Sequence, residues 1–108
     1  MNVAEVVDSL VRVAGRPIDA VHERLDWLLV GGLTVEPVTE SIGREAGTLR
    51  AERYHRARNR LSMADCVALA TARLHAASLA TSDPELAITA RSLGVDVIAL
   101  PDSRGVPP

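Results

Sequence analysis

Residues 78–100 limit the fold more than any other part of the chain. A short buried-type run at 78–81 is followed by a helical segment that starts at Asp83 and closes at Gly94, and then by the β-branched run 95–100. Such strand–helix–strand units normally place their two strands in parallel, because the helix carries the chain back before the second strand begins. The sequence therefore predicts an α/β sandwich with a parallel sheet flanked by helices.

Five further segments show recognisable periodicity. Apolar residues at helical spacing predict helices over residues 2–14, 18–30, about 39–56 and 62–75. The alternating, β-branched run 33–38 predicts a short strand that ends near Pro37, since proline cannot donate to a ladder. We expect one domain over residues 1–100 and a loose, Pro- and Gly-rich tail over residues 101–108. Only three strands are predicted, which is few for such a sheet.

The composition excludes several classes of protein. Apolar residues make up 47% and charged residues 24% of the chain, which is typical of a globular domain and argues against disorder. No run of 18 apolar residues and no secretory signal is present, so we expect a cytoplasmic protein with no membrane partner. Because the chain has one cysteine, Cys66, it forms no internal disulfide, and we expect this side chain to fill the core.

The basic residues are unevenly distributed, although the formal net charge of −2 gives no overall attraction for nucleic acid. All twelve basic residues are arginine, and five of them fall within eleven residues: Arg50, Arg53, Arg56, Arg58 and Arg60. Arginine binds phosphate bidentately and stacks on bases. The stretch is therefore either a phosphate-contacting patch or an ordinary solvated helix face.

Two aspartates stand at the predicted starts of helices in otherwise apolar sequence. Asp65 is the third helical residue after Ser62, which is a capping-box pattern, and Asp83 precedes a proline at the first helical position. Either aspartate can be a helix cap, or the pair can bind a divalent cation. Ligand sites of parallel sheets lie beyond the carboxyl ends of the strands, and Asp83 follows a strand directly. Glu5 is either an exposed first-turn acid or a third ligand.

The residues around these acids resemble a known family. Residues 61–72, 79–86 and 90–100 are together similar to the C-terminal half of PIN-domain ribonucleases, which include the VapC toxins of toxin–antitoxin pairs, and residues 2–6 resemble the family's first-helix motif. The resemblance implies a metal-dependent endoribonuclease in which Glu5, Asp65 and Asp83 are catalytic and hold Mg²⁺ or Mn²⁺. Thr81 and Ser82 match the motif positions beside Asp83. The implied partners are an RNA substrate, an antitoxin protein and further copies of the chain, as a homodimer or higher oligomer; the arginine stretch would contact RNA or the antitoxin.

The family pattern also begins with a hydrophobic strand that ends in an aspartate, and this strand has no counterpart ahead of Glu5. We therefore expect a PIN-like domain that is incomplete at its N-terminus. The true start could lie upstream, the chain could be a homologue that has lost catalysis, or another chain could complete the sheet. The alternative function is a catalytically inactive PIN-derived module that binds an antitoxin or another protein. A small scaffold resembling response regulators is a weaker third possibility, since the acidic pair at a first strand end is missing.

Overall fold

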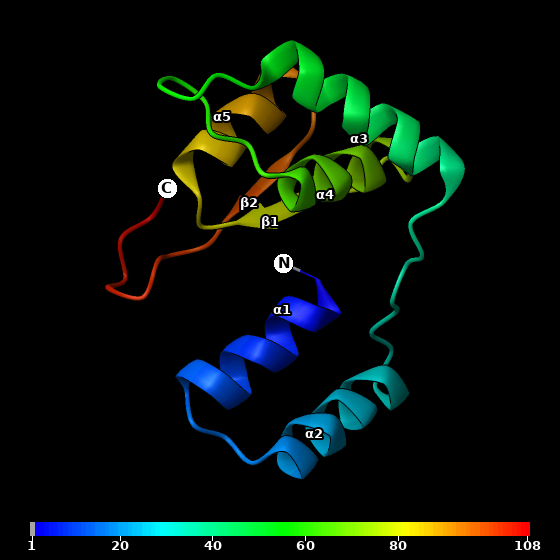
Figure 1. Ribbon diagram of the computed structural model, residues 1–108, viewed down its shortest axis with the longest axis vertical. Coiled ribbons are helices and arrows are strands. Elements are labelled where there is room, and N and C mark those ends of the chain that lie inside the picture. Colours follow the sequence, from blue (N-terminus) through cyan, green and yellow to red (C-terminus); the bar gives the residue numbers. More distant parts are fainter. Residues whose placement is uncertain (1) are drawn as a thin grey trace. The chain divides into compact units, whose positions relative to one another are not determined.

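The computed structural model describes residues 2–108, which form two compact units, one up to Pro37 and the other over Val38–Pro108 (Figure 1). Among the described residues, no helix has the length and apolar character needed to cross a membrane.

The first unit consists of helices. It contains α1 (Val3–Asp8), the π-helical segment η1 (Ser9–Val13) and α2 (Ile18–Val30). The Asn2 side chain caps α1 by accepting a hydrogen bond from the Glu5 N–H at 2.9 Å. Gly15, with φ of 68°, lies in the turn between η1 and α2, in a conformation that glycine adopts without strain. The predicted helices over residues 2–14 and 18–30 are confirmed, although the sequence did not predict the π-helical end of the first.

The predicted strand at residues 33–38 is wrong. Residues 33–39 have no regular secondary structure, and no strand within the described residues pairs with them. Leu33, Val35 and Val38 are each at least half exposed. A β-branched segment becomes a strand only where a ladder partner and a surface to pack on are available, because strand propensity reflects packing more than backbone preference. Within the described residues, this segment has no ladder partner.

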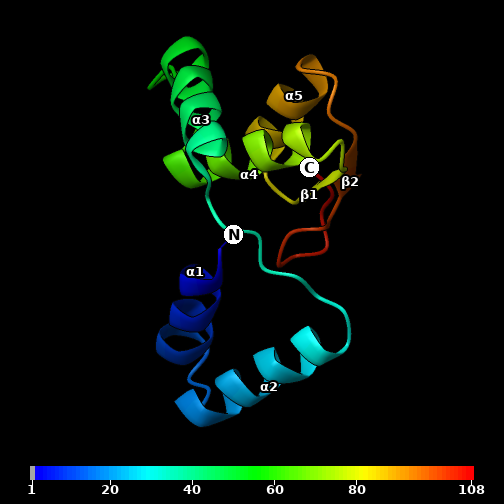
Figure 2. The same ribbon diagram turned by 90° about the vertical axis from the view of Figure 1, so that its right-hand side faces the viewer.

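The second unit contains the sheet. Its elements are α3 (Glu40–Arg53), α4 (Met63–Leu74), β1 (Leu79–Thr81), α5 (Pro84–Ser92) and β2 (Val97–Ala99). The two strands pair in parallel, with Leu79 opposite Val97 and Thr81 opposite Ala99 (Figures 1 and 2). The predicted parallel strand–helix–strand unit is confirmed. The sheet has two strands in the described residues instead of three, and β2 is shorter than the predicted run 95–100.

The core of the second unit lies between its helices and one face of the sheet. Helix α3 packs along α4, while α4 and α5 contact β1. Leu79 and Thr81 are buried on the covered face, whereas Ala80 and its partner Ile98 are exposed on the other. The core cluster contains Ile42, Ala46, Leu49, Leu61, Cys66, Leu69, Ala70, Ala72, Leu79, Leu86, Ala90 and Val95.

The C-terminal residues contain a turn built on Asp102. Its carboxylate accepts hydrogen bonds from the N–H groups of Arg104 (2.8 Å) and Val106 (2.9 Å), and it also pairs with the Arg104 guanidinium. The Val106 bond, together with the bonds from Arg104, holds the pKa of Asp102 below its ordinary value.

Candidate functional site

Asp83 lies at the carboxyl end of β1 and caps α5. Its Oδ1 accepts hydrogen bonds from the N–H groups of Glu85 (2.9 Å) and Leu86 (3.5 Å). The Asp83 N–H in turn donates to Thr81 Oγ1 at 3.0 Å, and Pro84 occupies the first turn, where no N–H is needed. The side chain is exposed, and no donor among the described residues bonds to Oδ2. Capping therefore uses one carboxylate oxygen and leaves the other available.

Asp65 is held by a different kind of cap at the start of α4. The predicted capping box with Ser62 is confirmed: Ser62 Oγ accepts from the Asp65 N–H at 3.0 Å, and Asp65 Oδ2 accepts from the Ser62 N–H at 3.1 Å. Asp65 is half-buried, and within the described residues its Oδ1 has no hydrogen-bond partner. Both aspartates thus have a structural role that still leaves one oxygen for a ligand.

Two hydrogen bonds bring the starts of α4 and α5 to the same side of the second unit. The Arg60 N–H, two residues before the α4 cap, donates to Glu85 Oε2 at 3.1 Å. Asn59 Nδ2 donates to Thr89 Oγ1 at 3.1 Å. The loop that enters α4 therefore lies along α5, with Arg60 at the first turn of α5, which follows the carboxyl end of β1 (Figure 1). The sequence did not reveal Glu85 and Asn59 as members of this edge.

Glu5 belongs to the first unit, where it is exposed in the first turn of α1. Its Oε1 accepts a hydrogen bond from Asn2 Nδ2 at 2.8 Å. Neither unit by itself gathers three His, Cys, Asp or Glu side chains into a metal-binding group among the described residues. A ligand set of Glu5, Asp65 and Asp83 stays a prediction.

The chemistry of these donors nevertheless fits a hard divalent cation. The two helix starts of the second unit offer carboxylate oxygens, which are the ligands that Mg²⁺ and Mn²⁺ prefer. The soft donor nearby, Cys66, is buried in the core at 1% exposure. Asp65 and Asp83 could therefore take part in holding such an ion, while Cys66 is unsuited to the task.

Cys66 follows Asp65 and is a core side chain, as the sequence predicts. Its burial, followed by the negative charge of Asp65, raises the pKa of the thiol above its ordinary value. A raised pKa lowers the fraction of thiolate, which is the reactive form. In EDTA at pH 8, iodoacetamide should modify native Cys66 at least about tenfold more slowly than the urea-unfolded chain. Equal rates in the two states would contradict this assignment.

The structure divides the five arginines of the 50–60 stretch into two groups. Arg50 donates from Nε to the Leu61 carbonyl at 3.2 Å, and its guanidinium lies 4.6 Å from the centre of the Tyr54 ring. Arg53 and Arg60 also have partners: Ser92 Oγ at 3.4 Å and the Arg56 carbonyl at 2.7 Å. Within the described part of the chain, the guanidinium groups of Arg56 and Arg58 make no hydrogen bond or ion pair. These two arginines are therefore the available cations of the stretch.

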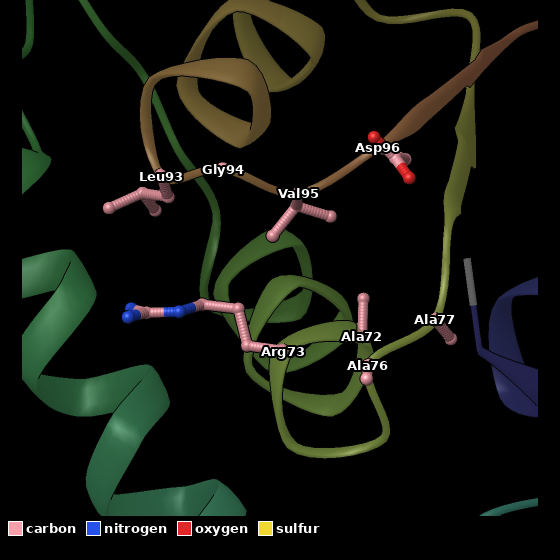
Figure 3. Close-up of a pocket in the computed structure, with 8 residues that line it drawn as sticks. All are labelled: Ala72, Arg73, Ala76, Ala77, Leu93, Gly94, Val95 and Asp96. Atoms are coloured by element: carbon pink, nitrogen blue, oxygen red, sulfur yellow. The ribbon is translucent and has the colours of Figure 1, made fainter.

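A pocket of about 310 Å³ in the second unit lies away from these acids (Figure 3). It is formed by the last turn of α4, the turn after α5 and the residues that enter the two strands, including Arg73 and Asp96. Arg73 is already paired with Glu45 at 2.7 Å. Because the pocket lies at the amino ends of the strands, it is not part of the edge that carries Asp65 and Asp83.

Comparison of the sequence with known protein families finds one match. The model of the PIN domain matches residues 2–92, a range that includes Glu5, Asp65 and Asp83. No curated protein and no solved structure matches the chain.

Proposed function

Since the chain belongs to the PIN-domain family, whose model matches most of its length, we propose that it is a divalent-metal-dependent endoribonuclease of the VapC toxin type. Membership of the family indicates a nuclease-type function, and family members generally bind RNA and depend on a divalent metal. The toxin type rests on the resemblance of the sequence around Asp65 and Asp83 to VapC toxins.

The observation that carries the proposal is how the carboxylate oxygens of the two aspartates are hydrogen-bonded. Asp65 and Asp83 stand at helix starts on one side of the second unit, and each has one carboxylate oxygen engaged in capping and the other without a partner in the described chain. With Glu5, they would hold Mg²⁺ or Mn²⁺. Such an ion, when bound, supplies an activated water and offsets the charge that develops on the scissile phosphate.

The chain's own residues would prepare this site before a metal arrives. The Ser62 N–H fixes Asp65, while the N–H groups of Glu85 and Leu86 fix Asp83. A ligand whose rotamer is already fixed loses less conformational entropy on binding. Thr81 Oγ1 accepts a hydrogen bond from the Asp83 N–H and so fixes the turn between β1 and α5.

We propose an antitoxin protein and further copies of the chain as protein partners. Helix α2 of the first unit exposes Trp27 (69%) and Val30 (89%), and exposed apolar side chains of this size are typical of surfaces that bind proteins. Acidic segments of an antitoxin would also complement the free arginines, Arg56 and Arg58.

The proposal is tested by incubating the purified full chain with RNA in Mn²⁺, in Mg²⁺ and in EDTA. Endonucleolytic products should form with metal and disappear in EDTA, because carboxylates without the metal are negatively charged and cannot offset the charge of the scissile phosphate. Cleavage that survives EDTA would contradict the proposal. Absence of cleavage in every metal, together with saturable micromolar binding of an antitoxin-like peptide, would favour the catalytically inactive binding module instead.

A further inference from the structure

Residues 55–59 form a closed turn between α3 and α4. The His55 N–H donates to the Asn59 carbonyl at 2.7 Å, and the Asn59 N–H donates back to the His55 carbonyl at 2.8 Å. Inside the turn, His55 Nδ1 accepts hydrogen bonds from the N–H groups of Ala57 (3.1 Å) and Arg58 (3.2 Å). One imidazole nitrogen therefore accepts from two backbone donors and helps to fix the path of the chain through Arg56 and Arg58, although the Arg58 N–H also reaches the His55 carbonyl at 3.2 Å.

The turn is also fixed to the rest of the second unit. Asn59 Nδ2 bonds to the buried Thr89 of α5, and the Arg60 N–H bonds to Glu85 in the first turn of the same helix. The Arg60 side chain returns to the Arg56 carbonyl at 2.7 Å. The turn is thus attached to the helix that Asp83 caps.

This fixed turn presents two cations that have no partner in the described chain. Arg56 and Arg58 are exposed, and the nearby acid Glu85 accepts from the backbone N–H of Arg60, just after the turn, rather than from either guanidinium. A guanidinium binds a phosphate through two parallel hydrogen bonds, and less entropy is lost when its backbone is already fixed. The bonds from Asn59 and Arg60 attach the turn to the helix that Asp83 caps, which favours a nucleic-acid strand that passes from the turn to the capping aspartates.

We infer that the turn at residues 55–59 is a phosphate-binding loop in which Arg56 and Arg58 hold the backbone of the RNA, and that His55 is its positioning residue. The inference rests on the proposed ribonuclease function for the identity of the strand. It assigns separate roles to the arginines of this stretch: Arg50, Arg53 and Arg60 stabilise the fold, and Arg56 and Arg58 bind the ligand.

Binding of a fluorescent single-stranded RNA, measured by anisotropy in EDTA over a series of salt concentrations, tests the arginines. Each phosphate contact contributes about 0.7 to the slope of log K against log salt concentration, so Arg56→Ala/Arg58→Ala should reduce that slope by about 1.4. The matched control, Arg44→Ala/Arg91→Ala, removes the same charge from α3 and the last turn of α5 and should leave the slope nearly unchanged. Equal losses in the two double variants, or no loss in either, would overturn the inference.

The role of His55 is tested by a pair of substitutions. His55→Ala removes the acceptor and should reduce the salt slope and raise KM in the Mn²⁺ cleavage assay while kcat stays the same. His55→Asn should keep the salt slope and KM close to their native values, because an asparagine side-chain oxygen can accept from the N–H of the residue two positions later, here Ala57. If the two variants are equally impaired, or if both behave like the native chain, His55 is not a positioning residue.

Different results contradict the proposed function and the loop assignment. Normal RNA binding in EDTA without metal-dependent cleavage counts against the proposed function and leaves the loop assignment standing. Cleavage that is unaffected by Arg56→Ala/Arg58→Ala overturns the loop assignment and leaves the function. An RNA that does not bind at low salt, where an acidic peptide binds through the same arginines, also overturns the loop assignment.

Discussion

Asp83→Asn is expected to lower metal-dependent RNA cleavage by at least about 100-fold without unfolding the protein. Asparagine is as good an N-cap as aspartate, so its side-chain oxygen can still accept the N–H groups of Glu85 and Leu86. What the substitution removes is the negative charge and the second carboxylate oxygen, which a divalent cation needs. The variant therefore separates the capping role of Asp83 from its proposed metal-binding role.

Initial cleavage rates in Mn²⁺ and urea unfolding curves, measured on the same preparations, decide between these roles. Asp65→Asn should also lower cleavage without unfolding the protein, since the asparagine oxygen can still accept a hydrogen bond from the Ser62 N–H of the capping box. The matched control is Asp19→Asn, which changes an exposed acid in the first turn of α2 and should alter neither quantity. Native cleavage rates in folded Asp83→Asn would show that Asp83 is only a helix cap.

The strand–helix–strand unit could be predicted because its boundaries are encoded locally. Asp83 and Pro84 specify the start of α5, and Gly94, with φ of 76°, specifies its end. The strand predicted at residues 33–38 failed because a strand depends on a partner strand, and no local pattern indicates whether a distant part of the chain supplies one. The same limit explains why β2 is shorter than the predicted run, since pairing with β1 is limited to three residues.

The candidate site was predictable in part for the same reason. The caps at Asp65 and Asp83 depend on neighbours within three residues, so the sequence revealed them. The bonds from Asn59 to Thr89 and from Arg60 to Glu85 span 30 and 25 residues, and no local pattern predicts them. Spacing likewise could not separate Arg50, which is bonded to the Leu61 carbonyl, from the free Arg58. For the turn at residues 55–59, the signals available in the sequence were its histidine, His55, and its asparagine, Asn59.

Leu69→Ala should have the largest effect on stability, a loss of about 2–5 kcal/mol in the free energy of unfolding. Leu69 is 1% exposed and belongs to the core cluster with Leu49 of α3 and Leu86 of α5, so its removal leaves a cavity that rigid helices fill poorly. For a domain of this size the melting temperature should fall by about 10–20 °C. Thermal unfolding of the full chain by circular dichroism measures this.

Ile88→Ala is the matched control, because Ile88 is 67% exposed on α5 and its truncation should change the free energy of unfolding by no more than about 0.5 kcal/mol. Equal melting temperatures for the two variants would contradict the core assignment. The substitution also bears on function, since Leu69 lies one helical turn after Asp65 on the same face of α4. Burial of Leu69 fixes the helix whose start carries Asp65. Cleavage by Leu69→Ala should therefore fall steeply with temperature, whereas cleavage by Asp65→Asn should be low at every temperature.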